Sequence, residues 1–131
     1  MARSKKLMKE ISKLLRNLED IPKFKNENEI EFFILGVLRG KYGNKKEVKR
    51  QVNAFSKGKV VKVDIAVEDD LAIEIKFPKN TADFERAIGQ IKKYADRFPY
   101  RILLVYDPHG RSFDLSGDDD KLKDVELVVW K

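Results

Sequence analysis

The sequence predicts an α/β protein in which helices flank a mixed β-sheet. In three segments apolar residues recur at three- and four-residue spacing, which is typical of amphipathic helices. Between and after these segments, β-branched residues alternate with polar ones, which is typical of strands. The order is helix, helix, three strands, helix and two strands, so we expect an α/β sandwich rather than a strict strand–helix repeat.

The three helices have recognisable starts and ends. The first covers residues 3–19 and ends before Pro22, the second has Asn28 as a candidate N-cap and ends at Gly43, and Thr81 can cap the third. Their apolar faces are Leu7, Ile11, Leu14, Leu15 and Leu18, then Ile30, Phe33, Ile34, Val37 and Leu38, then Phe84, Ala87, Ile88, Ile91 and Ala95.

Five segments are predicted to be strands. They are residues 47–55, 60–67, 71–77, 101–106 and 125–130. Polar turn residues separate them, including the turn at 56–58, the loop 68–70 and the polar loop 116–120. The chain of 131 residues is long enough for one domain with one core.

The composition limits the chemistry. The chain has no cysteine and one histidine, His109, so a metal would be held by oxygen ligands, which favours Mg²⁺ or Mn²⁺. The net charge of +6 suggests a polyanionic partner, either nucleic acid or an anionic membrane, although lysine also serves simply to keep a surface soluble. No apolar stretch is long enough to span a bilayer, and the basic start of the chain does not read as a signal peptide. We therefore expect a cytoplasmic protein without a membrane partner.

The central hairpin brings two carboxylates together. With a three-residue loop at 68–70, Val67 pairs with Leu71, and counting outward places Asp64 opposite Glu74. Alternation predicts one face made of Val61, Val63, Ile65, Val67, Leu71, Ile73, Ile75 and Phe77, and a second made of Lys62, Asp64, Ala66, Ala72, Glu74 and Lys76. The two alanines should leave open space beside the charges.

This arrangement opposes like charges. Asp64 faces Glu74 and Lys62 faces Lys76, and such pairs destabilise a sheet by roughly 0.2–1 kcal/mol each. A divalent cation between the carboxylates would turn this repulsion into binding. The alternative is an ordinary solvated face of the sheet.

The same residues carry a family resemblance. Asp64, nine intervening residues and Glu74-Ile75-Lys76 resemble the signature of the PD-(D/E)xK nuclease superfamily, although Val63 stands where the signature has proline. The run from Gln90 to Tyr94 resembles the QxxxY motif of RecB-type members.

A glutamate on the helix before the sheet belongs to the same resemblance. Glu31 fits best, because apolar residues follow it at spacings similar to those of archaeal Holliday-junction resolvases of this superfamily, and Glu27 is the alternative.

The resemblance implies a fold and a function. It implies a restriction-endonuclease-like αβββαβ core over residues 27–106, with an N-terminal helical extension at 1–22 and a C-terminal strand region at 107–131. It implies a Mg²⁺-dependent deoxyribonuclease, resolvase-like or RecB-type, that hydrolyses phosphodiester bonds without a small-molecule cofactor. The implied site consists of the metal ligands Glu31, Asp64 and Glu74, the catalytic residues Lys76 and Gln90, and the DNA contacts Lys62, Lys92, Lys93 and Tyr94.

Two further expectations concern partners. A nucleic-acid-binding module on the same fold would have no catalytic activity, and the matched set of Asp64, Glu74 and Lys76 argues against it. A subunit of a larger assembly, docked by the first helix, is compatible with either function. A homodimer would supply two sites for two strands, through either the leucine stripe at 7–18 or the apolar last strand at 125–130.

Overall fold

The computed structural model describes residues 3–56, 58–115 and 120–131. Its elements are α1 (Arg3–Arg16), α2 (Glu27–Tyr42), β1 (Val48–Ser56), β2 (Lys59–Val67), β3 (Leu71–Lys76), α3 (Thr81–Lys93), β4 (Tyr100–Tyr106), the short 3₁₀ helix η1 (Asp120–Leu122) and β5 (Val125–Trp130). This order confirms the mixed α/β class. The polar loop expected at 116–120 and part of the turn at 56–58 lie outside the described residues.

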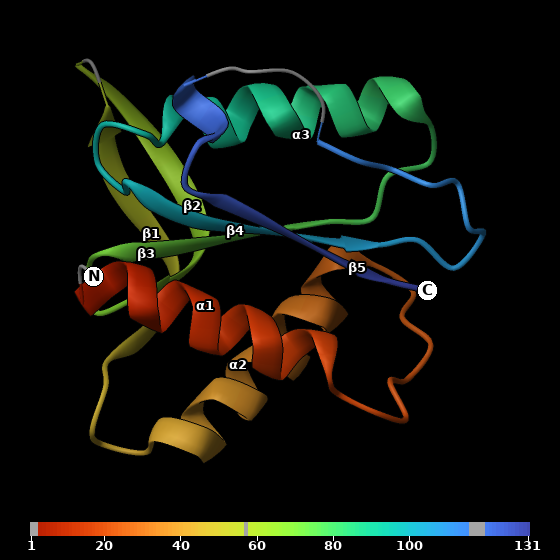
Figure 1. The fold of residues 1–131 in the computed structure, drawn as a ribbon, viewed down its shortest axis with the longest axis horizontal. Coiled ribbons are helices and arrows are strands. Elements are labelled where there is room, and N and C mark those ends of the chain that lie inside the picture. The colour runs from red at the N-terminus through yellow and green to blue at the C-terminus, as the bar shows by residue number, and fades with distance from the viewer. Residues whose placement is uncertain (1–2, 57, 116–119) are drawn as a thin grey trace.

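The sheet is open and mixed. Its strand order is β1-β2-β3-β4-β5. The pairs β1–β2 and β2–β3 are antiparallel, and the pairs β3–β4 and β4–β5 are parallel. Helices α1 and α2 lie on one face and α3 on the other, so the molecule has three layers (Figure 1). Because β5 pairs along β4, the C-terminal strand belongs to the same sheet as the predicted core.

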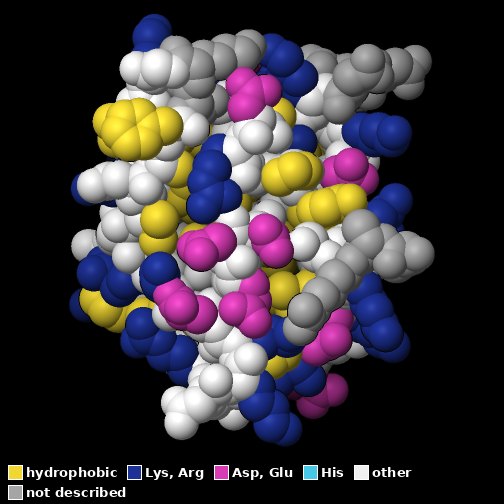
Figure 2. Space-filling view, turned by 90° about the vertical axis from the view of Figure 1, so that its left-hand side faces the viewer, with side chains coloured by type: hydrophobic (Ala, Val, Ile, Leu, Met, Phe, Trp, Pro, Cys, Tyr) yellow, Lys and Arg dark blue, Asp and Glu magenta, His cyan; other side chains and the backbone are white. Residues whose placement is uncertain are grey.

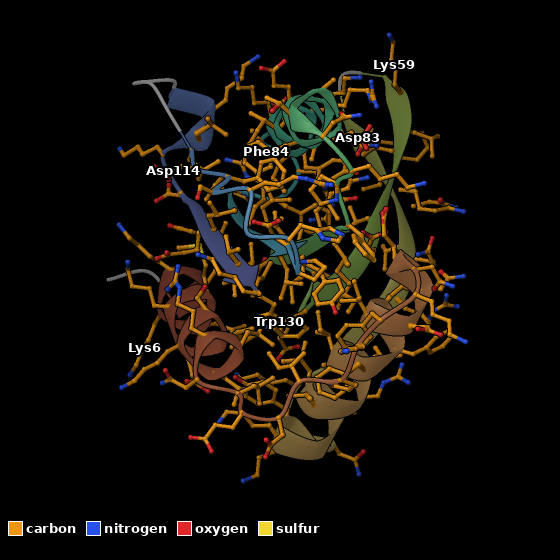
Figure 3. The ribbon with its side chains drawn as sticks, turned by 90° about the vertical axis from the view of Figure 1, so that its right-hand side faces the viewer. Lys6, Lys59, Asp83, Phe84, Asp114 and Trp130 are labelled. Carbon is orange, nitrogen blue, oxygen red and sulfur yellow. The ribbon has the colours of Figure 1, made fainter. Side chains whose placement is uncertain are left out.

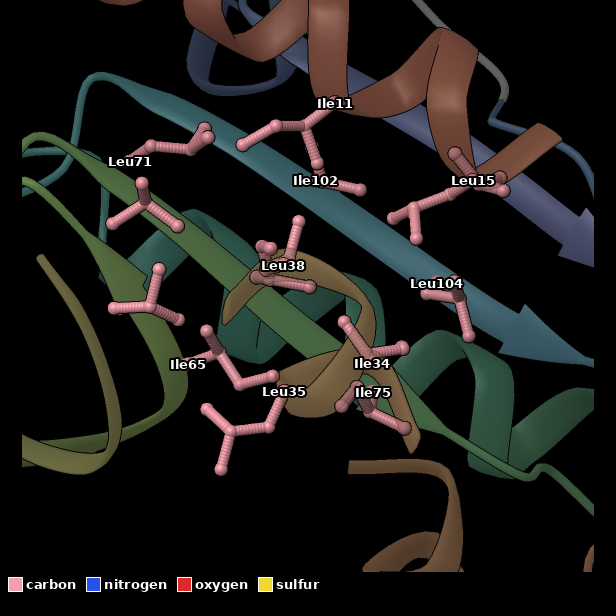
Figure 4. Close-up of a cluster of buried hydrophobic side chains, with 14 of the residues drawn as sticks. Ile11, Leu15, Ile34, Leu35, Leu38, Ile65, Leu71, Ile75, Ile102 and Leu104 are labelled. Carbon is pink, nitrogen blue, oxygen red and sulfur yellow. The ribbon is translucent and has the colours of Figure 1, made fainter. Parts of the chain in front are cut away.

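The larger core lies between the sheet and the helices α1 and α2. Ile11 and Leu15 from α1 and Ile34 and Leu38 from α2 have no exposed surface and point toward the strands (Figure 4). Burying such a side chain stabilises the fold by roughly 1.5–3 kcal/mol. The N-terminal helix is therefore part of the core, and its leucine stripe does not form an open dimer surface.

The second core lies between the sheet and α3. Ala66 and Ala72 are buried there beneath Ile91, Tyr94 and Phe98. The expected open space beside the alanines is therefore filled, and the prediction that only one face of the hairpin is core was wrong. The small alanines leave room for Ile91 of α3 and for Tyr94 and Phe98, which follow the end of that helix.

Two helix caps differ from the predictions. Asn26, not Asn28, is the N-cap of α2, and its side-chain oxygen accepts a hydrogen bond from the backbone N–H of Glu29 at 3.0 Å. Asn80, not Thr81, caps α3 in the same way through the N–H of Asp83 at 2.9 Å. In both cases asparagine satisfies a backbone donor of the first turn.

The ladder between β1 and β2 is interrupted at Gln51 and Asp64. The strands pair on both sides of this point, at Arg50 and at Val52, but Gln51 has a φ of 51°. This left-handed conformation is uncommon for a residue other than glycine. It allows Arg50 and Gln51, which are neighbours in a strand, to reach the same side of the sheet.

The interruption changes which way the hairpin side chains face. Ile65 lies in the core under α1 and α2, as predicted, whereas Val63 lies in the core under α3, with Val61 packed against it. The prediction that these three residues share one face was wrong, because the alternation changes at Asp64. Beyond this point β2 pairs only with β1, and the two form a ribbon of residues 52–56 and 59–63 that extends past β3.

The last strand lies at the edge of the sheet. Val128 and Trp130 are buried, and the indole N–H of Trp130 donates to the carbonyl of Leu15 at 2.9 Å. Arg16 donates to the carbonyl of Leu127 at 2.8 Å, so α1 also covers part of the free edge. The apolar character of this strand is thus satisfied within the chain. Among the described helices, none has the length and apolarity needed to cross a membrane.

Candidate metal and phosphodiester site

A hollow of about 650 Å³ lies where β3 ends and where α2 and α3 begin. Glu27 lines it from α2, Lys76 from β3, and Asp83, Arg86 and Gln90 from α3. This is the end of the molecule that Figure 3 shows, with Asp83 and Phe84 labelled at the start of α3. The carboxyl ends of parallel strands are a common place for sites in α/β folds.

Asp64 and Glu74 lie on the neighbouring strands beside this hollow. The hairpin register is as predicted, with Val67 opposite Leu71 and regular pairing as far as Ile65 and Ile73. Beyond that pair a side chain replaces the backbone pairing, because the Asp64 carboxylate accepts a hydrogen bond from the backbone N–H of Ile75 at 2.8 Å. Asp64 therefore holds its carboxylate against β3 and stays half-buried.

Glu74 is a buried carboxylate with little compensation. The residue is 3% exposed, and one of its oxygens, Oε2, has no hydrogen-bond partner among the described residues. The other, Oε1, lies 3.6 Å from Nζ of Lys76. A buried charge that is only partly paired is costly, so the site favours either a proton or a cation at Glu74.

The pKa of Glu74 reflects this environment. Burial raises the pKa of this carboxyl to about 8, and the negative charge of Asp64 adds to the effect. The positive charge of Lys76 acts in the opposite direction. A pair of acids of which one is strongly perturbed is a frequent property of functional sites.

Tyr94 was predicted to contact DNA, but it is buried inside the protein. It is 2% exposed, and its hydroxyl donates to the backbone carbonyl of Lys62 at 2.8 Å. Burial, followed by the negative charge of Glu74, raises the pKa of its phenol. In this structure Tyr94 is therefore a buried neighbour of Glu74 that ties α3 to β2, and it offers no surface to DNA.

The two candidate helix glutamates are separated by the fold. Glu31 is 2% exposed and points at β1, where Nη2 of Arg50 lies 2.7 Å from its carboxylate and the Gln51 amide also donates to it. Glu27 is the glutamate that lines the hollow with Lys76. Burial raises the pKa of Glu27, with Lys76 opposing and Asp64 adding to this shift. The geometry thus favours Glu27, the alternative, as the helix glutamate of the site.

The remaining predicted residues lie along α3 and β2. Gln90 is exposed and lines the hollow together with Lys76 and Lys93. Lys92 lines neighbouring hollows on α3. Lys62 is exposed on the ribbon, close to Asp64 along β2. Gln90 and Lys93 therefore meet the site, while Lys62 and Lys92 lie around it.

The donor set fits a hard divalent cation only in part. Asp64, Glu74 and Glu27 supply the carboxylate oxygens that Mg²⁺ prefers, and Oε2 of Glu74 lacks a partner among the described residues. However, within the described ranges no three acidic or histidine side chains form a ready-made metal cluster. Mg²⁺ is commonly bound through one or two carboxylates and retained waters, so Asp64 and Glu74 would suffice as its protein ligands.

The opposite end of the molecule has a different charge pattern. Asp and Glu side chains gather near the middle of the face on which β3 begins, with Lys and Arg around them (Figure 2). The turn between β2 and β3 supplies Glu68, Asp69 and Asp70, and Lys49 lies 3.9 Å from Asp69. The positive charge of the chain is therefore not spread evenly.

The chain matches no protein-family model, no curated protein and no solved structure. The site must be interpreted from its own geometry. Sequence reasoning did not assign Asp83 and Arg86 to the site, although they form an ion pair at the start of α3 and line the hollow. The signal was present, because an acid in a first helical turn beside a predicted strand end lies near any site formed there.

Proposed function

We propose that this protein is a metal-dependent deoxyribonuclease with a restriction-endonuclease-like core. The observation that carries the proposal is the buried Glu74 carboxylate beside Asp64, with Lys76 3.6 Å away and an oxygen that lacks a partner among the described residues. A surface selected only for stability would not keep two acids together in a buried place. Metal-dependent phosphodiester hydrolysis uses such a set, because carboxylates hold the cation and a positively charged group stabilises the phosphate beside it.

Each residue has a distinct part in the proposed reaction. A divalent cation, when bound, would polarise the phosphate and lower the pKa of a water molecule. Asp64 is fixed by the N–H of Ile75, which orients its carboxylate beside Glu74. Lys76 is placed to orient the attacking water and to stabilise negative charge on the phosphate as it develops. Glu27 closes the site from α2 and is the candidate for a third ligand or a base.

The test is an incubation with branched, duplex and single-stranded DNA. Cleavage is expected with Mg²⁺ or Mn²⁺, none with EDTA, and none from Glu74→Gln under any of these conditions. Glu68→Gln is the matched control, since it removes a carboxylate from the same hairpin at the opposite end of β3. Calorimetry with Mn²⁺ should show a site in the parent and in Glu68→Gln that is lost in Asp64→Ala and Glu74→Ala. Equal Mn²⁺ binding by all four proteins would contradict the proposed site.

A second candidate is a nucleic-acid-binding module without catalysis. It is favoured by one observation, that no three-ligand cluster is formed among the described residues. It predicts DNA binding that is the same in EDTA and in Mg²⁺, with no cleavage of any of the three substrates. The same incubation therefore separates the two candidates.

A further inference from the structure

Gly89 lies in the middle of α3, where glycine disfavours the helix relative to alanine. A methyl group placed on Gly89 would meet no atom of the described chain within 4 Å. Packing within the described part of the protein therefore gives no reason for glycine at this position. Open space above a glycine permits a ligand to approach the backbone closely, and Gly89 has this space where it lines the site hollow.

Three hollows border this glycine, and two of them lie on the side of the site and the ribbon. The first is the site hollow, which includes Lys76 and Gln90. The second, of about 320 Å³, lies between α3 and the ribbon and includes Lys59 and Lys92. Gly89 and Lys93 line both hollows, and residues four apart lie on one face of a helix. The two hollows therefore adjoin along α3, and we name them together the α3 groove.

We propose that the α3 groove seats the phosphodiester backbone of a DNA strand, which passes closest to the protein at Gly89 and from there enters the site. This inference rests on the proposed function for its ligand, and it adds the surface that delivers the strand.

The charges along the groove fit a polyanion. Its outer part is lined by four lysines and, among the described residues, one carboxylate, Asp96. Its inner part has mixed charge, with Lys76, Arg86 and Lys93 beside the carboxylates of Glu27 and Asp83, as expected where a cation and a phosphate would meet. Phosphate groups are bound chiefly by lysine and arginine, and most protein–DNA contacts are of this kind.

The ends of the groove are set by two elements. Lys59, at the start of β2, marks the ribbon end and Asp83 marks the site end; both are labelled in Figure 3. The ribbon can form the outer wall because β2 leaves β3 after Ile65. The acidic turn at 68–70 lies near the outer end of the groove, because Arg97, next to Asp96, donates to the carbonyl of Asp69 at 2.6 Å. A strand held in the groove would be directed toward the carboxylates of the site.

Substitution of Gly89 by glutamine tests the groove directly. Gly36→Gln and Gly40→Gln are matched controls, because both glycines lie within α2 and a methyl group on either would also meet no described atom within 4 Å. Each substitution replaces glycine by a better helix former, so all three should melt at a temperature equal to or above that of the parent. Binding to labelled single-stranded and duplex DNA is then measured by fluorescence anisotropy in EDTA, so that no cleavage takes place.

We expect Gly89→Gln to lose at least about tenfold in DNA affinity, while the two controls stay within about twofold of the parent. Lys59→Gln should lower the slope of log affinity against log salt by about one, as loss of one phosphate contact does. If Gly89→Gln binds as tightly as the parent, the groove is wrong and the nuclease proposal stands. If the parent binds neither DNA, both proposals are wrong. If binding behaves as expected but no DNA is cut with metal, the groove is supported and catalysis is not.

Discussion

Replacing Glu74 by glutamine should remove a dependence of stability on pH that the parent protein shows in the absence of metal. In the folded protein the pKa of Glu74 is raised from 4.5 to about 8. Between these values the folded state holds a proton that the unfolded chain has released. This contribution to stability is fully present below about pH 4.5 and is lost as the pH rises through about 8.

The size of the effect follows from the shift. A shift from 4.5 to about 8 corresponds at most to about 5 kcal/mol, at roughly 1.4 kcal/mol per pKa unit. This figure is an upper bound, because a folded protein relaxes around a buried charge and lets water reach it. We therefore expect the parent to lose on the order of 2–3 kcal/mol of unfolding free energy between pH 5 and 8.

Urea unfolding followed by fluorescence measures this loss, because Trp130 is the only tryptophan and is 3% exposed. In EDTA, the parent and Glu68→Gln should lose stability as the pH rises, whereas Glu74→Gln should change much less. Adding Mg²⁺ or Mn²⁺ at pH 8 should restore stability to the parent but not to Glu74→Gln, since the metal replaces the proton. A parent protein with the same stability at pH 5 and pH 8, or a variant with the same loss as the parent, would refute the assignment of Glu74 as the perturbed group.

Three further outcomes are expected. Lys76→Ala should bind DNA like the parent and cut it at least about 100-fold more slowly, because one lysine adds little to affinity but stabilises the transition state. A cleavage rate within about threefold of the parent would remove Lys76 from the mechanism. Glu27→Gln should slow cleavage with little change in melting temperature. Glu31→Gln should instead lower the unfolding free energy by about 1–3 kcal/mol, because it weakens the contacts with Arg50 and Gln51. The reverse result would make Glu31 the site residue. Light scattering at micromolar concentration should give a monomer mass, because both surfaces expected to form a dimer are used within the chain; a dimer mass would show that a different surface associates.

The hairpin shows how far the sequence determines the site. Val67 opposite Leu71 was predictable, because a three-residue polar loop leaves one register. The change of face at Asp64 was not, because it depends on the left-handed conformation of Gln51. Glutamine is not a turn residue, and only its contact with Glu31 on α2 explains this backbone.

The helix glutamate was ambiguous for a related reason. Glu27 and Glu31 are four residues apart, so they lie on the same face of α2. Which of the two glutamates reaches the site depends on where β1 crosses α2. That crossing depends on tertiary packing, which local sequence patterns do not give. The N-caps were ambiguous in the same way, because Asn26 and Asn28 both have the side chain that a cap needs.

The interruption at Gln51 and Asp64 also separates the exposed tip of the ribbon from its base, which stays packed under α3 through Ala54 and Val63. The inner part of the hairpin is buried under helices on both faces, so substitutions there affect the whole fold. The tip carries the exposed Phe55 and Val60 as a cross-strand pair, and β2 pairs with β3 no further than Ile65. The amides of the tip should exchange with solvent through local opening, faster than those of β3 and β4. During evolution such a segment can vary in length and in surface chemistry, and so adapt to new partners, without moving the carboxylates of the site.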